Sequence, residues 1–529
     1  MTRMTLTMLD PSGIQEYVFR SNRLQENIGA SEIVYRVTTQ WAFDALDEEK
    51  LIHNVTLGDR EMGEWGWKDE EARGLPHSNW DAEVVFAGGG NTLILFRDGT
   101  GETAKKFTRR LTHRVLKEAP GLNVVVGHWS LEWETEPLWQ AQEALLRDLA
   151  RHKRSAARPS STEPCDSTGL VAVRTDERQI KIEKKLRSLR IGGQDNEPAR
   201  NISRETMYKL GWRDLANARL KQQVGQNLQG AFDFPSDIDH LGRAKGEESF
   251  VAVVHADGNA MGQHVKRVAD GLSTDDLPQA NQEYVIRLRK FSDRVNEASL
   301  KALRRIVGLT AARVQYNPEA KRYEIGREPG DPLPINGRYL PFRPLVFGGD
   351  DVTFLTAGPL GLSLAVAYLQ AFEEETATAF TEEINQGKPT MHAGAGVAIV
   401  KSHYPFSRAY DLSEKLTGSA KEAVRKWNEG DQSAIDWHFA LTGLGGDLRA
   451  IREREYQMVE DQGLLMRPLR LRATTLQQDG RYWLDGVERV INDFQTSPLW
   501  ADRRNKVKGL LQAIAIGPNE LERYRQTYG

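Results

Sequence analysis

One order of predicted elements occurs twice along the 529-residue chain, and this repeat restricts the fold more than any other feature. In each copy a strand is followed by a helix, two strands that meet at a glycine turn, a second helix and a last strand. The copies consist of residues 4–9, 23–46, 83–96, 102–118 and 123–126, and of residues 250–256, 282–307, 343–356, 361–385 and 392–400. The order strand–helix–strand–strand–helix–strand is that of a ferredoxin-like palm. We therefore expect an α+β fold with two palm domains.

The two copies differ at the turn between their paired strands. The second copy has Gly348-Gly349-Asp350-Asp351 there, whereas the first has Gly88-Gly89-Gly90-Asn91 and no acidic residue. Glycine at a hairpin tip lets a ligand approach the backbone, and the two aspartates place adjacent carboxylates beside it. An acidic pair in only one copy indicates an active domain beside a degenerate one, whose own turn is expected only to pack.

A third carboxylate, Asp257, directly follows the strand 250–256. A strand-end aspartate followed by an acidic hairpin is the layout of a palm-type nucleotidyl-transfer site. Asp257, Asp350 and Asp351 are therefore predicted to be catalytic and to hold two cations, Mg²⁺ or Mn²⁺, which take oxygen ligands and bridge them to substrate phosphates. Two interpretations compete with this one. Asp257 can cap the helix that follows it, and the acidic turn can be an ordinary surface loop.

Other residues near these aspartates are predicted to bind nucleotide. Gly348 and Gly349 would admit the nucleotide close to the backbone, and Asn259 would add an oxygen ligand or contact a phosphate. The predicted helix 405–426 carries Lys415 and Lys421 near its middle, where a lysine can neutralise a triphosphate. The alternative for both lysines is a solvated position on the helix surface.

Composition excludes several classes of protein. The single cysteine, Cys165, excludes an intramolecular disulfide and a cysteine-cluster zinc site. No apolar run of about 18 residues and no signal-like start occur, so we expect a cytoplasmic protein with no membrane contact. The G-x-x-x-x-G-K-[ST] phosphate loop is absent, so use of ATP cannot depend on one. The formal net charge of −3 neither requires nor excludes nucleic acid.

We divide the chain into four predicted domains: a degenerate first palm (1–130), a helical, basic inter-palm region (131–245), a catalytic second palm (246–435) and a C-terminal helical domain (436–529). Residues 151–221 contain 17 Lys/Arg against 9 Asp/Glu. This excess can follow an RNA backbone, but it can equally form a solvated helix face, a linker or a contact with a partner protein.

At these motifs the chain resembles the large polymerase-cyclase subunit of type III CRISPR effector complexes, over most of its length. The matching segments of the first palm are Ser12 to Phe19, Gly29-Ala30-Ser31 and Ala87 to Asn91. Those of the second palm are Asp257 to Gly262, Phe347 to Asp351, His392 to Val400, Tyr404-Pro405 and Ala420-Lys421. The last pair is what makes Lys421, rather than Lys415, a predicted nucleotide-binding residue.

The resemblance implies a synthase that joins ATP into cyclic oligoadenylate messengers, with tandem palms forming a composite pocket for two nucleotides. It also implies activation by target RNA and partnership with guide RNA and other effector subunits. Three departures are visible. No His-Asp nuclease domain precedes the first palm, so DNA cleavage is not expected. The zinc-binding cysteines are absent, and Asn259 stands where a second aspartate is common.

Two other functions remain open from the sequence. The chain can be a non-catalytic scaffold that binds RNA or effector subunits, or a diguanylate-cyclase-like enzyme that uses GTP. The retained acidic turn opposes the scaffold, whereas Asn259 and the missing domains favour it. The tandem arrangement, and a turn that ends in a second Asp rather than Glu-Phe, fit a diguanylate cyclase poorly. The base used, the ring size of the product and the assembly state do not follow from the residues.

Overall fold

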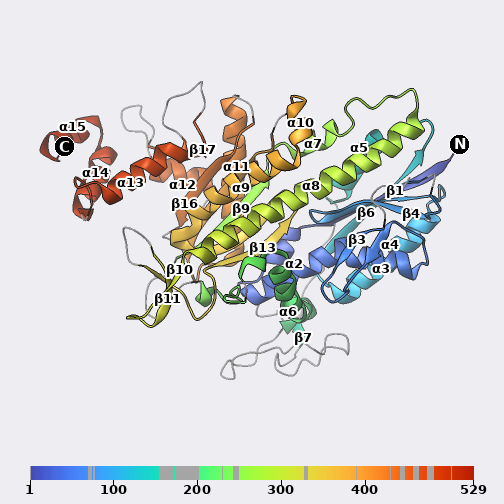
Figure 1. Ribbon diagram of the computed structural model, residues 1–529, viewed down its shortest axis with the longest axis horizontal. Coiled ribbons are helices and arrows are strands. Elements are labelled where there is room, and N and C mark those ends of the chain that lie inside the picture. The colour runs from blue at the N-terminus through green and yellow to red at the C-terminus, as the bar shows by residue number, and fades with distance from the viewer. Residues whose placement is uncertain are drawn as a thin grey trace.

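The computed structural model describes residues 2–68, 74–75, 78–153, 172–173, 202–228, 230–241, 250–326, 332–388, 390–428, 431–440, 447–456, 464–473, 482–501 and 503–528. Two sheets, each covered by helices, lie side by side, and the helical C-terminal segment extends from the end of the second (Figure 1). None of the helices in these ranges has the length and apolar character needed to cross a membrane.

The first palm is a four-stranded antiparallel sheet in the order β4-β5-β1-β6. Its elements are β1 (Arg3–Ser12), α1 (Ile14–Phe19), α2 (Leu24–Thr38), α3 (Gln40–Glu48), β4 (Ala82–Gly88), β5 (Asn91–Phe96), α4 (Glu102–Glu118) and β6 (Asn123–Glu132). A small ribbon of β2 (Val55–Leu57) and β3 (Trp65–Trp67) is inserted between α3 and β4. This strand order is the ferredoxin-like arrangement that the sequence predicts.

The second palm repeats that arrangement and extends it. Its elements are β9 (Phe250–Gly258), α7 (Met261–Arg267), α8 (Leu277–Ala312), β13 (Phe342–Gly348), β14 (Asp351–Ala357), α9 (Gly361–Ala379), α10 (Thr381–Asn385), β15 (Ala393–Lys401), α11 (Phe406–Trp427), β16 (Ala434–Ala440) and β17 (Leu469–Arg470). The sheet order is β13-β14-β9-β15-β16-β17, so its first four strands match the first palm. Both hairpins also have the same register irregularity, between Val84 and Phe86 and between Pro344 and Val346. The prediction of two related palms is confirmed.

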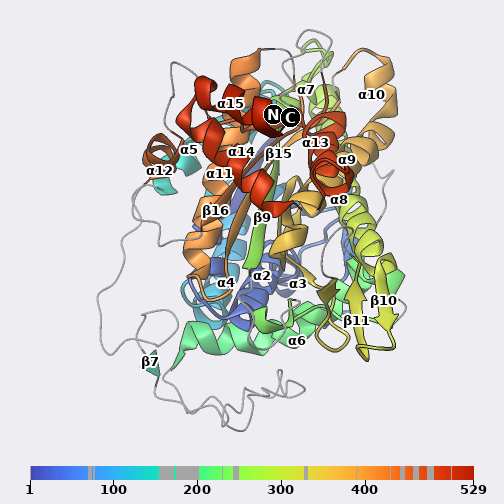
Figure 2. The same ribbon diagram turned by 90° about the vertical axis from the view of Figure 1, so that its left-hand side faces the viewer.

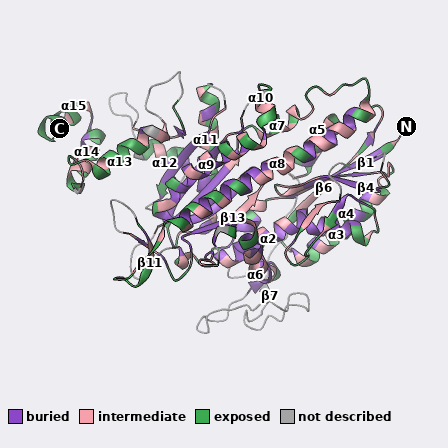
Figure 3. Ribbon diagram, viewed as in Figure 1, coloured by how far each residue is buried: buried purple, intermediate pink, exposed green. Residues whose placement is uncertain are grey.

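One large hydrophobic cluster extends through both palms. Buried side chains of the first palm, such as Leu9 and Phe19, belong to the same cluster as Val253, Leu345 and Tyr410 of the second. The rings of Phe19 and Tyr410 stack at 4.0 Å between centroids. Figure 2 shows the second sheet between α11 on one side and α8 and α9 on the other. In Figure 3 the buried stripe of α8 alternates with exposed turns, as expected for a long amphipathic helix. Because the core is continuous, the palms are held in a fixed relation.

The second sheet continues past residue 435, where the sequence analysis places the start of a helical domain. β16 runs parallel to β15 as the fifth strand. The sequence does not predict a buried strand here, because Asp436 interrupts the apolar pattern. Asp436 is nevertheless fully buried, with its charge paired to Arg452 at 2.6 Å. The predicted boundary at 435 therefore cuts through this strand. Beyond it β17 still belongs to the sheet, and the other described residues include the helices α12 (Leu448–Glu455), α13 (Glu488–Thr496), α14 (Arg504–Ile516) and α15 (Pro518–Tyr528).

The inter-palm region contributes two long helices, α5 (Leu138–Lys153) and α6 (Arg204–Val224). The remaining short strands are β7 (Ala172–Val173), β8 (Ile202–Ser203), β10 (Val314–Asn317), β11 (Arg322–Ile325) and β12 (Leu333–Pro334). Most of the basic segment 151–221, with Cys165, lies outside the described residues. The prediction of an RNA contact there stays a prediction.

Candidate active site

The tip of the acidic hairpin is a two-residue turn that is anchored to a neighbouring helix. β13 and β14 end their pairing at Gly348 and Asp351, so Gly349 and Asp350 form the turn itself. Gly349 has φ 63°, a left-handed conformation that favours glycine. Its backbone N–H donates to Asn296 Oδ1 of α8 at 3.2 Å, which ties the tip to the long helix. The turn is therefore held in place from outside the hairpin.

The three predicted carboxylates come together at this tip. Asp351 lies directly opposite Asp257 in the β14–β9 ladder. Asp350 lies against the backbone that follows Asp257, because a Cβ placed on Gly258 would come within 2.8 Å of the Asp350 Cβ. Glycine at 258 thus creates the space that Asp350 uses. One strand end and one turn bring all three side chains to the same edge of the sheet.

Burial and charge repulsion make two of these carboxylates, Asp350 and Asp351, unusually basic. Burial, and then the charge of Asp257, raise the pKa of Asp350 to about 7. The same two causes raise the pKa of Asp351 to about 8. His255 offers little compensation: its Nδ1 lies 3.3 Å from Asp351 Oδ1, but burial lowers the pKa of the imidazole and favours its neutral form.

Lys421 of α11 brings a positive charge into the group. Its Nζ donates to Asp257 Oδ2 and, at 2.7 Å, to the carbonyl oxygen of Gly258. The side chain reaches this place across Gly394, where an added Cβ would come within 2.8 Å of the Lys421 Cγ. Gly394 is the β15 residue opposite Asp257. Packing of Lys421 therefore explains why the segment His392 to Val400 has glycine at this position. Lys415 of the same helix is exposed, in agreement with a solvated lysine.

Asn259 is buried and contacts a different part of the chain. Its Nδ2 donates at 3.0 Å to Asp431 Oδ1 and at 3.0 Å to the carbonyl oxygen of Gln432. These contacts hold the segment that precedes β16, and a role of Asn259 in nucleotide binding stays a prediction. The structure also excludes Asp257 as a helix cap: α7 has Ala260 at its N-cap position, in a left-handed conformation and without a side-chain cap.

The oxygen donors at the tip are those that Mg²⁺ and Mn²⁺ prefer. They are the three carboxylates and the Gly258 carbonyl, and Asp351 Oδ1 is buried without a hydrogen bond among the described residues. An ammonium group already lies between Asp257 and Gly258, which shows that this place accepts a cation. The part of the chain that the structure describes contains no group of three acidic or histidine side chains arranged to hold a metal ion. The chemistry of the donors fits a divalent cation, whose entry requires Lys421 and the carboxylates to rearrange.

A cleft of about 820 Å³ opens beside the tip and is lined by both palms. The first palm contributes Gly88–Gly90 and residues of α2, and the second contributes Phe347, Gly348 and Asp351. The two hairpin tips touch, because a Cβ built on Gly349 would lie 3.4 Å from the Gly89 Cα. The glycines of the first hairpin therefore do more than pack, since they also form a wall of the cleft.

The cleft also includes residues that the sequence analysis missed. Asn296 of α8, Arg219 of α6 and Trp67 of the β2–β3 ribbon all line it. None belongs to a motif, so only the tertiary fold identifies them. The segment Gly29-Ala30-Ser31 gains an explanation from packing. Gly29 admits α6, whose Lys209 carbonyl would lie 1.6 Å from an added Cβ, and Ser31 Oγ donates to Leu345 O of β13 at 2.5 Å.

A family model matches part of the chain. Residues 250–428 match the family model described as Cas10/Cmr2, second palm domain. The sequence has no match among curated proteins. The fold is similar to the apo Csm1–Csm4 cassette (TM-score 0.45, 12% identity, 82% of this chain and 54% of that one) and to the apo state of a type III-B Cmr-beta complex (TM-score 0.45, 9% identity, 82% and 70%). It is also similar to the Csm1–Csm4 cassette in complex with cA4 (TM-score 0.42, 12% identity, 82% and 54%). The chain thus spans about half the length of the first chains that it matches, 54% of each.

Proposed function

We propose, from the premise that residues 250–428 form a second palm domain of the Cas10/Cmr2 family, that this chain is a metal-dependent nucleotidyltransferase that converts ATP to cyclic oligoadenylates in type III CRISPR defence. One observation carries the proposal. Asp257, Asp350 and Asp351 meet at a glycine hairpin tip, and Asp351 and Gly348 line a cleft large enough for nucleotides.

Each residue at the tip has a role in this proposal. Asp257, Asp350 and Asp351 would hold Mg²⁺ or Mn²⁺, which would supply the positive charge that offsets the negative charge of the reacting phosphates. Gly348 and Gly349 have no side chain to block a nucleotide from the backbone. When a divalent cation binds the Asp257 carboxylate, the Lys421 ammonium group would leave Asp257 and pair with a phosphate instead.

The proposal includes partners. The matching solved structures are of Csm1–Csm4 cassettes and of a Cmr complex. We propose that this chain likewise works with other effector subunits, and that binding of target RNA through a guide RNA switches the reaction on. The family match over residues 250–428 supports this extension, and the described residues neither require nor oppose it.

The test is to incubate the purified protein with each nucleoside triphosphate and Mg²⁺ or Mn²⁺, with and without target RNA and partner subunits, and to analyse products by mass spectrometry. Cyclic oligoadenylate from ATP is the expected result. A product from GTP alone would favour the diguanylate-cyclase-like alternative. No product and no Mg²⁺-dependent binding of ATP would favour the scaffold. Full activity in the Asp350→Ala, Asp351→Ala double variant would overturn the assignment of the site.

A further inference from the structure

A buried cluster of three charged side chains lies under the acidic hairpin and carries more positive than negative charge. Glu32 of α2 is fully buried and pairs with two arginines: Oε1 with Arg36 Nε at 2.6 Å and Oε2 with Arg219 Nε at 2.7 Å. One carboxylate thus faces two guanidinium groups. Since a buried charge is costly unless it is compensated, the cluster favours a further anion nearby.

Of the two arginines that share Glu32, Arg219 is the one with a donor left for another anion. Arg36 uses its remaining donors on neutral oxygens, those of the Gln40 side chain and of the Arg60 and Glu61 carbonyls. Arg219 is 5% exposed and donates from Nη1 to Gln223 Oε1 at 2.8 Å. Its Nη2 has no partner among the residues that the structure describes. This donor is available to a ligand.

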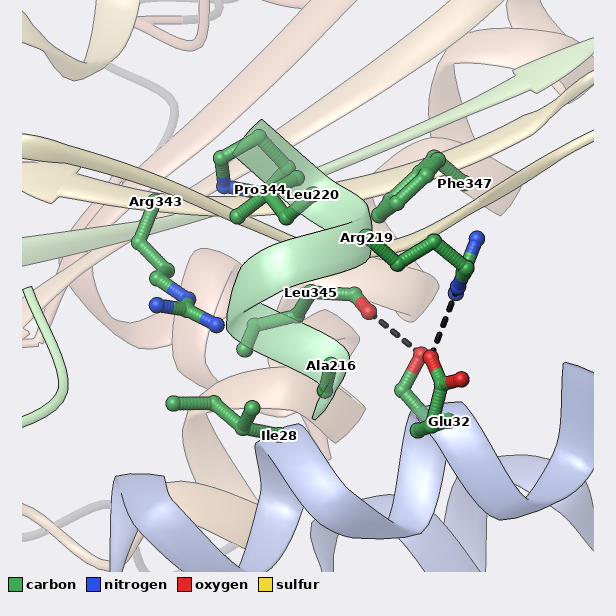
Figure 4. Close-up of a pocket in the computed structure, with 10 residues that line it drawn as sticks. Ile28, Glu32, Ala216, Arg219, Leu220, Arg343, Pro344, Leu345 and Phe347 are labelled. Carbon is green, nitrogen blue, oxygen red and sulfur yellow. Dashed lines mark hydrogen bonds and ion pairs between the residues drawn. The ribbon is translucent and has the colours of Figure 1, made fainter. Parts of the chain in front are cut away.

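The position of Arg219 directs it to the composite cleft. Figure 4 shows its side chain leaving α6 toward Glu32 of α2, with Phe347 of β13 beside it. Its guanidinium carbon lies 3.9 Å from the centroid of the Tyr35 ring and 5.3 Å from that of Phe347. These rings, with Glu32, fix the plane of the group. Tyr35, Phe347 and Arg219 all line the cleft that contains Asp351.

We propose that Arg219 is an anion-binding residue of this cleft and that it contacts phosphate oxygens of a bound nucleotide. The inference rests on the proposed function, to which it adds a residue from outside both palms. The free Nη2 carries two N–H groups that can donate charge-assisted hydrogen bonds to phosphate oxygens, and the fixed plane of the guanidinium lowers the entropy lost on binding. The phosphate belongs either to the triphosphate of ATP or to the phosphodiester of a linear oligoadenylate.

The experiment compares ligands with and without phosphate. Binding of ATP, of adenosine and of linear di-adenylate without a terminal phosphate is measured by calorimetry, with Mg²⁺, for wild type, Arg219→Gln and Arg219→Lys. Arg213→Gln is the matched control, because Arg213 lies on the same helix but pairs with Asp214 at 2.8 Å and does not line the cleft. We expect Arg219→Gln to weaken ATP binding by roughly 10- to 100-fold, Arg219→Lys to weaken it less, and adenosine to bind all variants equally.

The outcomes separate the possible failures. Loss of affinity for ATP but not for di-adenylate would identify the triphosphate as the anion, and loss for both would identify the phosphodiester as well. Loss for di-adenylate alone would identify the phosphodiester as the anion. Unchanged affinity for both ATP and di-adenylate in folded Arg219→Gln would overturn the inference and leave the proposed function intact. Equal losses for ATP and adenosine would also overturn it, since they would show a structural role. Failure of wild type to bind ATP would refute the proposed function itself. If Arg219→Gln does not fold, the same comparison is made with Arg219→Lys, which keeps the charge.

Discussion

Asp351 lies directly opposite Asp257 across the β14–β9 ladder, so these two carboxylates are neighbours on adjacent strands. Asp350 lies next to both, against Gly258. Burial, and then repulsion by the charge of Asp257, raise the pKa of Asp350 to about 7 and that of Asp351 to about 8. A bound cation would relieve this repulsion, and this has measurable consequences.

Divalent cations should stabilise the folded protein through these carboxylates. A ligand present at about 100 times its dissociation constant adds about 2.7 kcal/mol to the free energy of unfolding. We expect Mg²⁺ or Mn²⁺ to raise Tm in a thermal-shift assay, relative to EDTA, in wild type but much less in Asp257→Ala. A shift of equal size in both proteins would place the cation elsewhere.

Replacing Asp351 by asparagine should stabilise the metal-free protein at high pH. The unfolded chain ionises Asp351 near the ordinary pKa of 3.8, whereas the folded chain holds the proton until about pH 8. Between these values the wild type therefore loses stability as pH rises, by up to about 1.4 kcal/mol per pH unit. Asparagine has no such loss, so the Tm advantage of Asp351→Asn in EDTA should grow from about pH 5 to about pH 8.

Mg²⁺ supplies the control for this pH series. A bound cation favours the ionised carboxylate, so the advantage of Asp351→Asn should shrink when Mg²⁺ is added. An advantage that is constant with pH would show that the side-chain amide stabilises the fold for another reason, and that Asp351 ionises normally.

The first palm offers a matched control for the carboxylates that we propose to be catalytic. Asp10, near the end of β1, pairs with Lys153 of α5 at 2.6 Å, much as Asp257 pairs with Lys421 of α11. The hairpin beside Asp10 has Gly90 and Asn91 where the second palm has the two aspartates. We expect Asp257→Ala to abolish pyrophosphate release from ATP and Asp10→Ala to leave most of it. Equal loss of activity in the two variants would mean that the first palm is not degenerate.

The sequence predicted the fold where its pattern is local. Both palms, their strand order and their hairpin turns follow from the hydrophobic runs and from the glycines at the two hairpin turns. β16 was missed because Asp436 interrupts the apolar pattern, and its charge is paired with Arg452 and Arg467, which come later in the chain.

For the site, the sequence identified the residues that stand at strand ends. Asp257, Asp350 and Asp351 meet as expected, and Lys421 joins them across Gly394. Arg219 had no local signal, since it is one of many charges on α6, and only the crossing of α6 over α2 brings it to the cleft. Asn259 shows the opposite case: it belongs to the Asp257 motif, yet its amide group contacts residues 431 and 432.

The contacts of Asn259 predict what its replacement does. Its Nδ2 donates to Asp431 and to Gln432, and the side chain is 6% exposed, so Asn259→Ala leaves two partly buried acceptors without this donor. An unsatisfied buried group costs about 1–3 kcal/mol, and we expect a loss of that size in the free energy of unfolding from urea titration. Asn259→Asp should be worse at neutral pH, because it sets a second carboxylate against Asp431. If Asn259 instead serves only to bind nucleotide, Asn259→Ala will unfold like wild type and bind ATP more weakly.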